Sequence, residues 1–204
     1  MIELSKTEGL WVLAINRPDK ANSLTRVMLG QIDEIAARAA DEGARALVLT
    51  GKGKVFSAGA DLEEARAGLA TDAIWEQLSA RIAGLPCLTI AALNGTLAGG
   101  AFGMVLACDL RIAAPEAKFF YPVMKLGFLP QPSDPKRMAA LIGPARAKMI
   151  LMAGQKIGAE EALGWGLIDR IVAPEALGET AAALASDASA AREDLAGSIK
   201  KLFD

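Results

Sequence analysis

Two glycine-rich stretches decide the fold: Phe56–Leu62, which reads FSAGADL, and Asn94–Phe102, which reads NGTLAGGAF. An apolar run typical of a buried strand precedes each, Ala46–Thr50 before the first and Cys87–Leu93 before the second. A predicted helix follows each stretch, and the first backbone N–H groups of a helix have no partner within it. Taken alone, the first stretch is explained as well by a tight strand-to-helix turn that needs small residues. The alternative for the second is close helix–helix packing through Gly99 and Gly103. Taken together, they offer two sets of free N–H groups that can hold one oxyanion.

Strands and helices alternate on both sides of these stretches. Hydrophobic spacing and turn residues predict a β-hairpin over 2–16, a strand over 109–113, an extended segment over 118–123 and a strand over 167–172. They predict helices over 24–40, 61–84, 100–108, 133–142, 144–153 and 159–164, and a helical segment over 174–202. The first of these helices would be capped by Ser23 or Thr25, and the second would be broken near 68–71. Asp61 and Glu64 fit a reciprocal capping pair at the helix that begins there. This order predicts an α/β fold in a single domain, 1–204, with its core over about 1–172.

Composition narrows the classes of function. Of the 204 residues, 52% are hydrophobic and 23% are charged, which is ordinary for a globular protein. A net charge of −2 gives no reason to expect nucleic acid or an anionic membrane surface as a partner. Pro86–Cys108 carries no charge, but Asn94-Gly95 and Gly99-Gly100 favour a buried strand, a turn and a buried helix over a membrane span. Because Met1–Leu10 shows no secretory signal, we expect a cytoplasmic protein.

The chain contains no histidine. This absence excludes Ser-His-Asp and Cys-His nucleophilic catalysis and every mechanism that needs a histidine base. Cys87 and Cys108 lie in apolar runs without metal-ligand spacing, so we expect them to be core residues in a reducing compartment. Because two cysteines alone cannot complete a tetrahedral zinc shell, we expect no metal site.

Six segments match a known pattern in order and spacing: Asn16–Pro18, Phe56–Leu62, Ala91–Phe102, Ala107–Ala113, Lys125–Pro130 and Ala159–Val172. Over nearly the whole chain they resemble the enoyl-CoA hydratase/isomerase (crotonase) family. The resemblance implies a crotonase/ClpP-like spiral of ββα units with a C-terminal helical segment, about 174–204, that is shorter than usual. It implies an enzyme, assembled as a homotrimer or a dimer of trimers, that takes an acyl-CoA or enoyl-CoA thioester. Coenzyme A would enter as part of the substrate, with no bound prosthetic group.

The resemblance also assigns roles to individual positions. The backbone N–H groups of Ala60 and Gly100 would form an oxyanion hole that polarises the thioester carbonyl and stabilises an enolate. The positions that would lie along coenzyme A are Lys20, Ala21, Ala58, Ala60, Asp61, Leu62 and Gly100.

Two positions depart from the family pattern. Hydratases of the family use two glutamates, which would correspond to Gly103 and Val123 here, and isomerases commonly keep the second. Water addition needs a base and an acid, and glycine and valine are neither. Three hypotheses therefore stay open: an enzyme of the hydratase/isomerase type with an acid elsewhere, a non-catalytic acyl-CoA-binding paralogue, and a structural protein without a ligand.

Two side chains are candidates for the missing proton transfer. Asp134 lies in the loop Pro130–Pro135, which in the family borders the acyl pocket, although a helix N-cap is the simpler interpretation. Tyr121 can donate a proton or a hydrogen bond, and a core tyrosine with a satisfied hydroxyl explains it equally well. Asp61 is expected to cap a helix rather than to take part in the chemistry.

Overall fold

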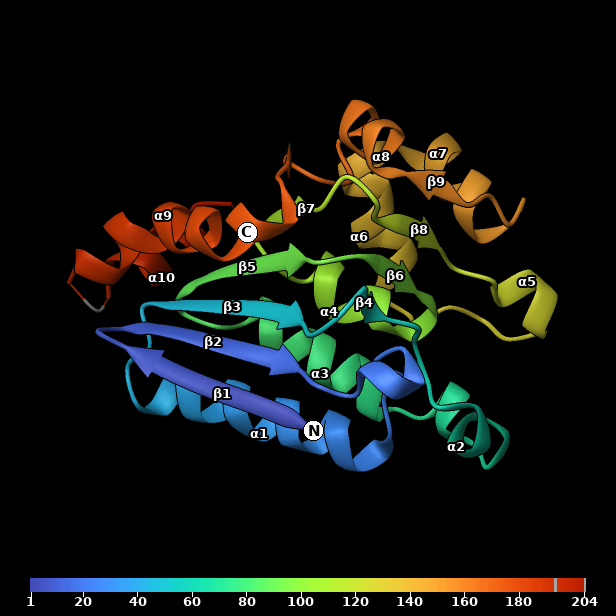
Figure 1. The fold of residues 1–204 in the computed structure, drawn as a ribbon, viewed down its shortest axis with the longest axis horizontal. Helices are drawn as coiled ribbons and strands as arrows, with labels where there is room; N and C mark the ends of the chain where they lie inside the picture. The colour runs from blue at the N-terminus through green and yellow to red at the C-terminus, as the bar shows by residue number, and fades with distance from the viewer. Residues whose placement is uncertain (193, 204) are drawn as a thin grey trace.

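The computed structural model describes residues 1–192 and 194–203, and in them two β-sheets are surrounded by helices (Figure 1). The strands of the larger sheet, in spatial order, are β1 (Ile2–Thr7), β2 (Leu10–Ile15), β3 (Ala46–Gly51), β5 (Leu88–Leu93), β7 (Leu110–Ala113) and β10 (Arg170–Ile171). Those of the smaller sheet are β4 (Val55–Ser57), β6 (Thr96–Ala98), β8 (Lys118–Phe120) and β9 (Ile157–Gly158). The α/β fold expected from the sequence is confirmed.

The larger sheet is parallel except at its first strand. β1 and β2 form an antiparallel hairpin that turns at Glu8 and Gly9, both of which have positive φ. From β2 to β10, neighbouring strands run parallel. Helices α1 (Arg26–Asp41) and α3 (Ile74–Ala83) cover one face, and α9 (Leu177–Ala190) covers the other (Figure 1). Because β3 is covered on both faces, its residues are almost all apolar and buried.

Three strands of the larger sheet are each followed by a short strand of the smaller one. β4 follows β3, β6 follows β5 and β8 follows β7, and the short strands pair in parallel. A helix comes after each pair: α2 (Leu62–Arg66), α4 (Phe102–Leu106) and α5 (Val123–Leu126). These are the expected ββα units. Because β4 and β6 are parallel neighbours, the two glycine-rich stretches that follow or end them lie at the same edge of the sheet.

The structure differs from the sequence-based expectation mainly in short elements. β4, β6 and β9 are only two or three residues long, which is too short for a recognisable alternation of apolar and polar residues. The helix expected over 100–108 is a 3-10 helix, Gly99–Ala101, followed by α4. The extended segment expected over 118–123 ends with β8, before α5 begins. The strand expected over 167–172 is reduced to β10.

Three of the remaining helices begin and end within a few residues of the predicted positions: α6 (Asp134–Ile142), α7 (Pro144–Leu151) and α8 (Ala159–Trp165). The helical segment expected over 174–202 is instead divided into a 3-10 helix, Pro174–Ala176, then α9 and α10 (Leu195–Lys200). The segment 61–84 is broken between α2 and α3, as expected. Thr25, rather than Ser23, caps α1, because its Oγ1 accepts a hydrogen bond from the Met28 N–H at 3.2 Å. The uncharged segment 86–108 folds into β5, β6 and α4. No helix in the described part of the chain is long and apolar enough to cross a membrane.

Candidate active site

The two glycine-rich stretches meet where β4 and β6 end. Gly59 has a φ of +91° and Gly99 a φ of +57°, a region that residues with a Cβ rarely adopt. A Cβ atom at Gly59 would lie 2.9 Å from the carbonyl oxygen of Ala98 and 3.5 Å from the nitrogen of Gly100. Backbone conformation and the close approach of the two chains therefore both require glycine at position 59.

At this meeting point two backbone N–H groups have no acceptor among residues 1–192 and 194–203. Leu24 donates to the Gly59 carbonyl at 2.8 Å, and Asp61 donates to the Leu24 carbonyl at 2.9 Å. The Ala60 N–H lies between these bonded groups and has no acceptor in the described part of the chain. Gly100 is the second residue of its 3-10 helix, so its N–H precedes the first hydrogen bond of that helix. Both residues line the same cleft.

This cleft has a volume of about 360 Å³ and mostly apolar walls. Parts of α2, the segment around Trp75, the start of the 3-10 helix and the segment 121–131 line it. Three atoms of the Trp75 ring lie 3.2–3.3 Å from where a Cβ on Gly100 would be, so the ring packs directly against the Gly100 backbone. The indole N–H donates to the carbonyl of Leu69 at 2.8 Å, which holds the ring in place. The sequence offered no signal for this contact beyond an apolar position in a helix.

A buried asparagine that sequence reasoning missed holds the first stretch in position. Asn22 is fully buried with a φ of +53°. Its Nδ2 donates to the carbonyl oxygens of Lys52 at 2.9 Å and Val55 at 2.6 Å, next to β4. The Ser57 hydroxyl donates to the Asn22 carbonyl at 2.8 Å. The loop before α1 is therefore fastened to the strand that leads into the cleft.

Asp61 caps α2, as the sequence predicted. One carboxylate oxygen accepts hydrogen bonds from the N–H groups of Glu63 at 3.1 Å and Glu64 at 3.4 Å. The other accepts from the Arg17 guanidinium at 2.8 Å, and this hydrogen bond is the main cause that lowers the pKa of Asp61. The expected reciprocal bond from Glu64 is wrong, because the Glu64 carboxylate accepts the N–H of Arg26 at 2.7 Å instead.

The positions predicted to lie along coenzyme A fall into two groups. Those that line the cleft are Ala58, Ala60, Leu62 and Gly100. Lys20, Ala21 and Asp61 lie outside its lining. Lys20 is exposed at the end of a 3-10 turn. Ala21 accepts the Ala58 N–H at 3.0 Å, so it supports the cleft wall through its backbone.

Tyr121 and Asp134 are hydrogen-bonded to each other. The Tyr121 hydroxyl donates to Asp134 Oδ2 at 3.0 Å, and Tyr121 also lines the cleft. Its ring stacks on Phe102, with 5.4 Å between centroids and 12° between planes. The expectation that Asp134 caps α6 is wrong: Ser133 precedes the helix, and Asp134 is its first residue, fully buried. Asp134 Oδ1 has no hydrogen-bond partner in the described part of the chain.

The surroundings of this pair set its protonation. Burial raises the pKa of Asp134 to about 7; the hydrogen bond from Tyr121 acts in the opposite direction, the Glu76 carboxylate raises the pKa further and Arg137 lowers it. Burial also raises the pKa of Tyr121, and the charge of Asp134 adds to that effect. Asp134 therefore changes protonation near neutral pH while Tyr121 keeps its proton.

Known proteins share this arrangement of segments. The family model described as enoyl-CoA hydratase/isomerase matches residues 5–204. The chain belongs to the enoyl-CoA hydratase/isomerase family. It is 34% identical to a probable enoyl-CoA hydratase of Mycobacterium bovis over 172 residues, and this aligned region covers 84% of this chain and 70% of that protein. It is 34% identical to 1,2-epoxyphenylacetyl-CoA isomerase of Escherichia coli over 188 residues, and this aligned region covers 87% of this chain and 72% of that protein.

A solved structure of a similar protein superimposes on nearly the whole chain. The crystal structure of an enoyl-CoA hydratase from Bacillus anthracis superimposes with a TM-score of 0.92 at 32% identity, covering 99% of this chain and 81% of that one. The crotonase-type fold is thereby confirmed. The names of these similar proteins include both a hydratase and an isomerase of CoA thioesters.

The two positions at which the enoyl-CoA hydratase/isomerase family led us to expect glutamates now have a place in the structure. Val123 is the first residue of α5 and lines the cleft. Gly103 lies in α4, where a Cβ atom would be 3.1 Å from Asp134 Oδ1. Neither residue carries a proton that it can exchange. In the described residues, no group of three or more acidic or cysteine side chains is placed to hold a metal ion.

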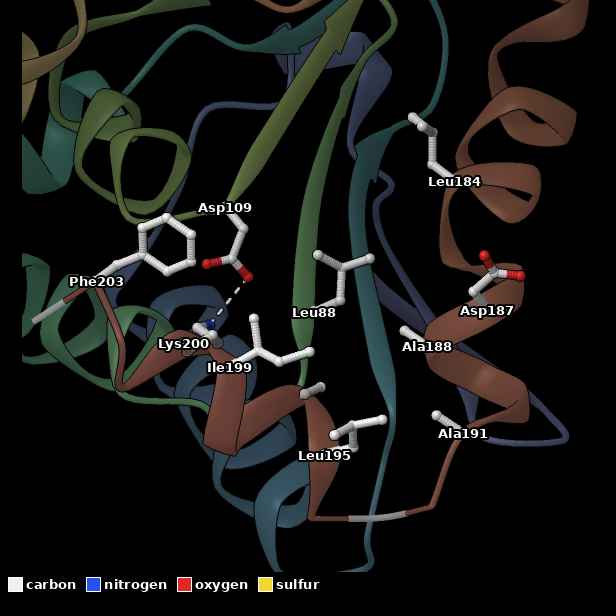
Figure 2. A pocket seen from close by; sticks show the side chains of 11 residues that line it. Leu88, Asp109, Leu184, Asp187, Ala188, Ala191, Leu195, Ile199, Lys200 and Phe203 are labelled. Atoms are coloured by element: carbon white, nitrogen blue, oxygen red, sulfur yellow. Dashed lines mark hydrogen bonds and ion pairs between the residues drawn. The ribbon is translucent and has the colours of Figure 1, made fainter.

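A second hollow of about 550 Å³ lies between α9, α10 and the start of β5 (Figure 2). Aliphatic side chains line most of it, among them Leu88, Leu184 and Ile199. At one edge Lys200 forms an ion pair with Asp109 at 3.0 Å. None of the predicted site residues lines this hollow, whereas five of them, Ala58, Ala60, Leu62, Gly100 and Tyr121, line the first cleft.

Proposed function

We propose that this protein acts on an acyl-CoA thioester whose carbonyl oxygen accepts hydrogen bonds from the backbone N–H groups of Ala60 and Gly100. The observation that carries the proposal is the close approach of Gly59 to Ala98 and Gly100, where two residues whose N–H groups have no acceptor in the described part of the chain line one cleft. Family membership supplies the substrate class. Each donor of this kind is typically worth about 3 kcal/mol in the transition state.

Such an oxyanion hole favours the states in which negative charge lies on the thioester oxygen. When the α-proton leaves, its C–H electron pair enters the new carbon–carbon double bond and the charge moves to that oxygen. The Trp75 ring against Gly100 keeps water away from this side, and hydrogen bonds are stronger where water is excluded. Leu62, whose side chain is 73% exposed while lining the cleft, would meet the pantetheine arm near the mouth.

Acetoacetyl-CoA offers a direct test, because its enolate absorbs in the ultraviolet and its keto form does so only weakly. We expect calorimetry to show binding and the absorbance of the bound ligand to rise at constant pH. Gly100→Ala should reduce that rise, because its Cβ would press on the Trp75 ring at 3.2 Å and displace the donor. Gly30→Ala, a control in α1 with nothing within 4 Å of the new methyl group, should leave it unchanged. Binding without any rise in enolate absorbance would refute the oxyanion hole.

A second candidate function is a non-catalytic acyl-CoA-binding protein. The observation in its favour is that Gly103 and Val123 lack the carboxyl groups of the family's usual mechanism. Turnover distinguishes the two candidates. The test is a panel of acyl-CoA and enoyl-CoA thioesters. If they bind without α-proton exchange, isomerisation or hydration, the binding function is supported and the catalytic function is refuted.

The assembly and the cytoplasmic location expected from the sequence are part of the same proposal. The family resemblance supports assembly as a homotrimer or a dimer of trimers. Sedimentation velocity over a range of concentrations tests the assembly, and a monomer at all concentrations would contradict it.

A further inference from the structure

The absence of a side chain at position 103 makes room for a carboxyl group that comes from another helix. A Cβ atom on Gly103 would lie 3.1 Å from Asp134 Oδ1 and 3.6 Å from the Ser79 hydroxyl oxygen. Asp134 is carried by α6 and is fully buried. Its carboxyl group therefore occupies the space into which a side chain at 103 would point.

Tyr121 connects this buried carboxyl group with the cleft. Its hydroxyl donates to Asp134 Oδ2 at 3.0 Å, while the residue itself lines the cleft together with Gly100. Stacking on Phe102 fixes the plane of the ring. Because the O–H bond points toward Asp134, a lone pair of the hydroxyl oxygen remains for a proton that arrives from the other side.

The charged groups around Asp134 are hydrogen-bonded to serine residues rather than to Asp134. The Ser133 N–H and hydroxyl donate to Glu76 at 3.2 and 3.0 Å. Arg137 donates to the Ser133 hydroxyl at 2.8 Å and to the Ser79 hydroxyl. Within the described part of the chain, the Tyr121 hydroxyl is the hydrogen-bond donor that reaches the Asp134 carboxyl group. Proton movement to or from Asp134 therefore passes through Tyr121.

We propose that Tyr121 and Asp134 form a proton relay that supplies, from α6, the acid–base function missing at positions 103 and 123. The proposal rests on the thioester function proposed above and names its chemistry. The substrates are acyl-CoA or 3-enoyl-CoA thioesters with an acidic α-C–H bond. The reaction is α-proton exchange or migration of the double bond, because no residue that lines the cleft in the described part of the chain carries a carboxyl group that could activate water.

The Tyr121 oxygen accepts the α-proton of the substrate while the Tyr121 proton moves to the Asp134 carboxylate. The C–H electron pair enters the enolate double bond, and the charge on the thioester oxygen is held by Ala60 and Gly100. In the reverse direction Asp134 returns its proton to Tyr121, which protonates the α-carbon or, in a conjugated enolate, the γ-carbon. Tyr121 is thus the catalytic residue that touches the substrate, and Asp134 acts through it.

The relay predicts a definite dependence on pH. Asp134 starts the reaction as a carboxylate, and burial together with Glu76 raises its pKa to about 7 against the opposing effects of Tyr121 and Arg137. Exchange of the α-protons of butyryl-CoA in deuterated water, followed by proton NMR, should therefore rise with pH through a midpoint near 7. Isomerisation of 3-butenoyl-CoA should follow the same profile.

Two conservative variants test the relay. Asp134→Asn keeps an acceptor for the Tyr121 hydroxyl, and Tyr121→Phe keeps the stacking on Phe102. Each should lower the exchange rate about 100-fold at alkaline pH, and Asp134→Asn should also abolish the pH dependence. Both should still bind acetoacetyl-CoA and raise its enolate absorbance. Asp187→Asn, an exposed position in α9, is the matched control and should retain the rate and the pH profile.

The possible results distinguish a failure of the oxyanion hole from a failure of the proton relay. Absence of acyl-CoA binding by the unaltered protein would end both. Binding with a rise in enolate absorbance but no exchange at any pH would end only the relay. The relay is equally refuted if Asp134→Asn exchanges at the original rate with the original profile. If neither variant folds, the profile of the unaltered protein decides, since a rate without a midpoint near 7 contradicts the role of Asp134.

Discussion

The buried carboxyl group of Asp134 makes a quantitative prediction about stability that does not depend on activity. Asp134 is fully buried, and burial raises its pKa from the ordinary value of 3.8 to about 7. The folded protein therefore holds this proton at pH values where the unfolded chain has released it. Stability falls as pH rises from about 4 to about 7, and the loss attributable to this group is about 4 kcal/mol.

Asp134→Asn removes the ionisation and keeps the size of the side chain. At about pH 4 the variant should be close in stability to the unaltered protein or somewhat weaker, because a protonated carboxyl group and an amide are both neutral. At about pH 8 the variant should have gained relative stability, so that the difference in free energy of unfolding changes by about 4 kcal/mol across this range. Other ionisable groups titrate in both proteins, so their contributions to the free energy of unfolding cancel in the difference.

Urea unfolding monitored by circular dichroism at a series of pH values measures this difference directly. Asp187→Asn, on the exposed side of α9, serves as the control and should show a difference that is small at every pH. If the difference for Asp134→Asn is also independent of pH, the carboxyl group is ionised in the folded protein without penalty. The raised pKa of Asp134, and with it the midpoint near pH 7 that the relay predicts, would then be refuted.

Three further outcomes follow from other contacts. Arg17→Ala should destabilise the fold by about 1–3 kcal/mol in urea unfolding, because the half-buried Asp61 carboxylate loses its charged partner at 2.8 Å; an unchanged midpoint would contradict this. Gly95→Ala should cost about 3 kcal/mol or more, because its Cβ would lie 2.0 Å from the Lys54 carbonyl oxygen, whereas Gly178→Ala meets nothing within 4 Å and should be tolerated. Burial raises the pKa of the two cysteine thiols to about 11 and about 12, so thiol reagents at neutral pH should label them only after unfolding; rapid labelling of the folded protein would disprove their burial.

Local patterns determined most of the long elements. Apolar runs predicted β3 and β5, helical spacing predicted α1, and the glycines of FSAGADL and NGTLAGGAF marked the turns between strand and helix. These features depend on backbone preferences and burial over a few neighbouring residues, which the order of amino acids states directly. The short strands β4, β6 and β9 depend on a partner strand far away in the chain, so no local pattern announces them.

The same distinction applies to the site. By itself the sequence determined which backbone stretches carry unpaired N–H groups, and it showed that positions 103 and 123 hold no carboxylate. Only the tertiary structure decided that a Cβ on Gly59 would come within 3.5 Å of the Gly100 nitrogen. It also decided that Asp134 is buried beside Gly103 and accepts a hydrogen bond from Tyr121. A proline after Asp134 locally favours a helix cap, but packing between α4 and α6 placed the carboxyl group in the interior. The packing of the whole chain determines which side chains from distant segments come into contact, and no single stretch of residues determines that packing.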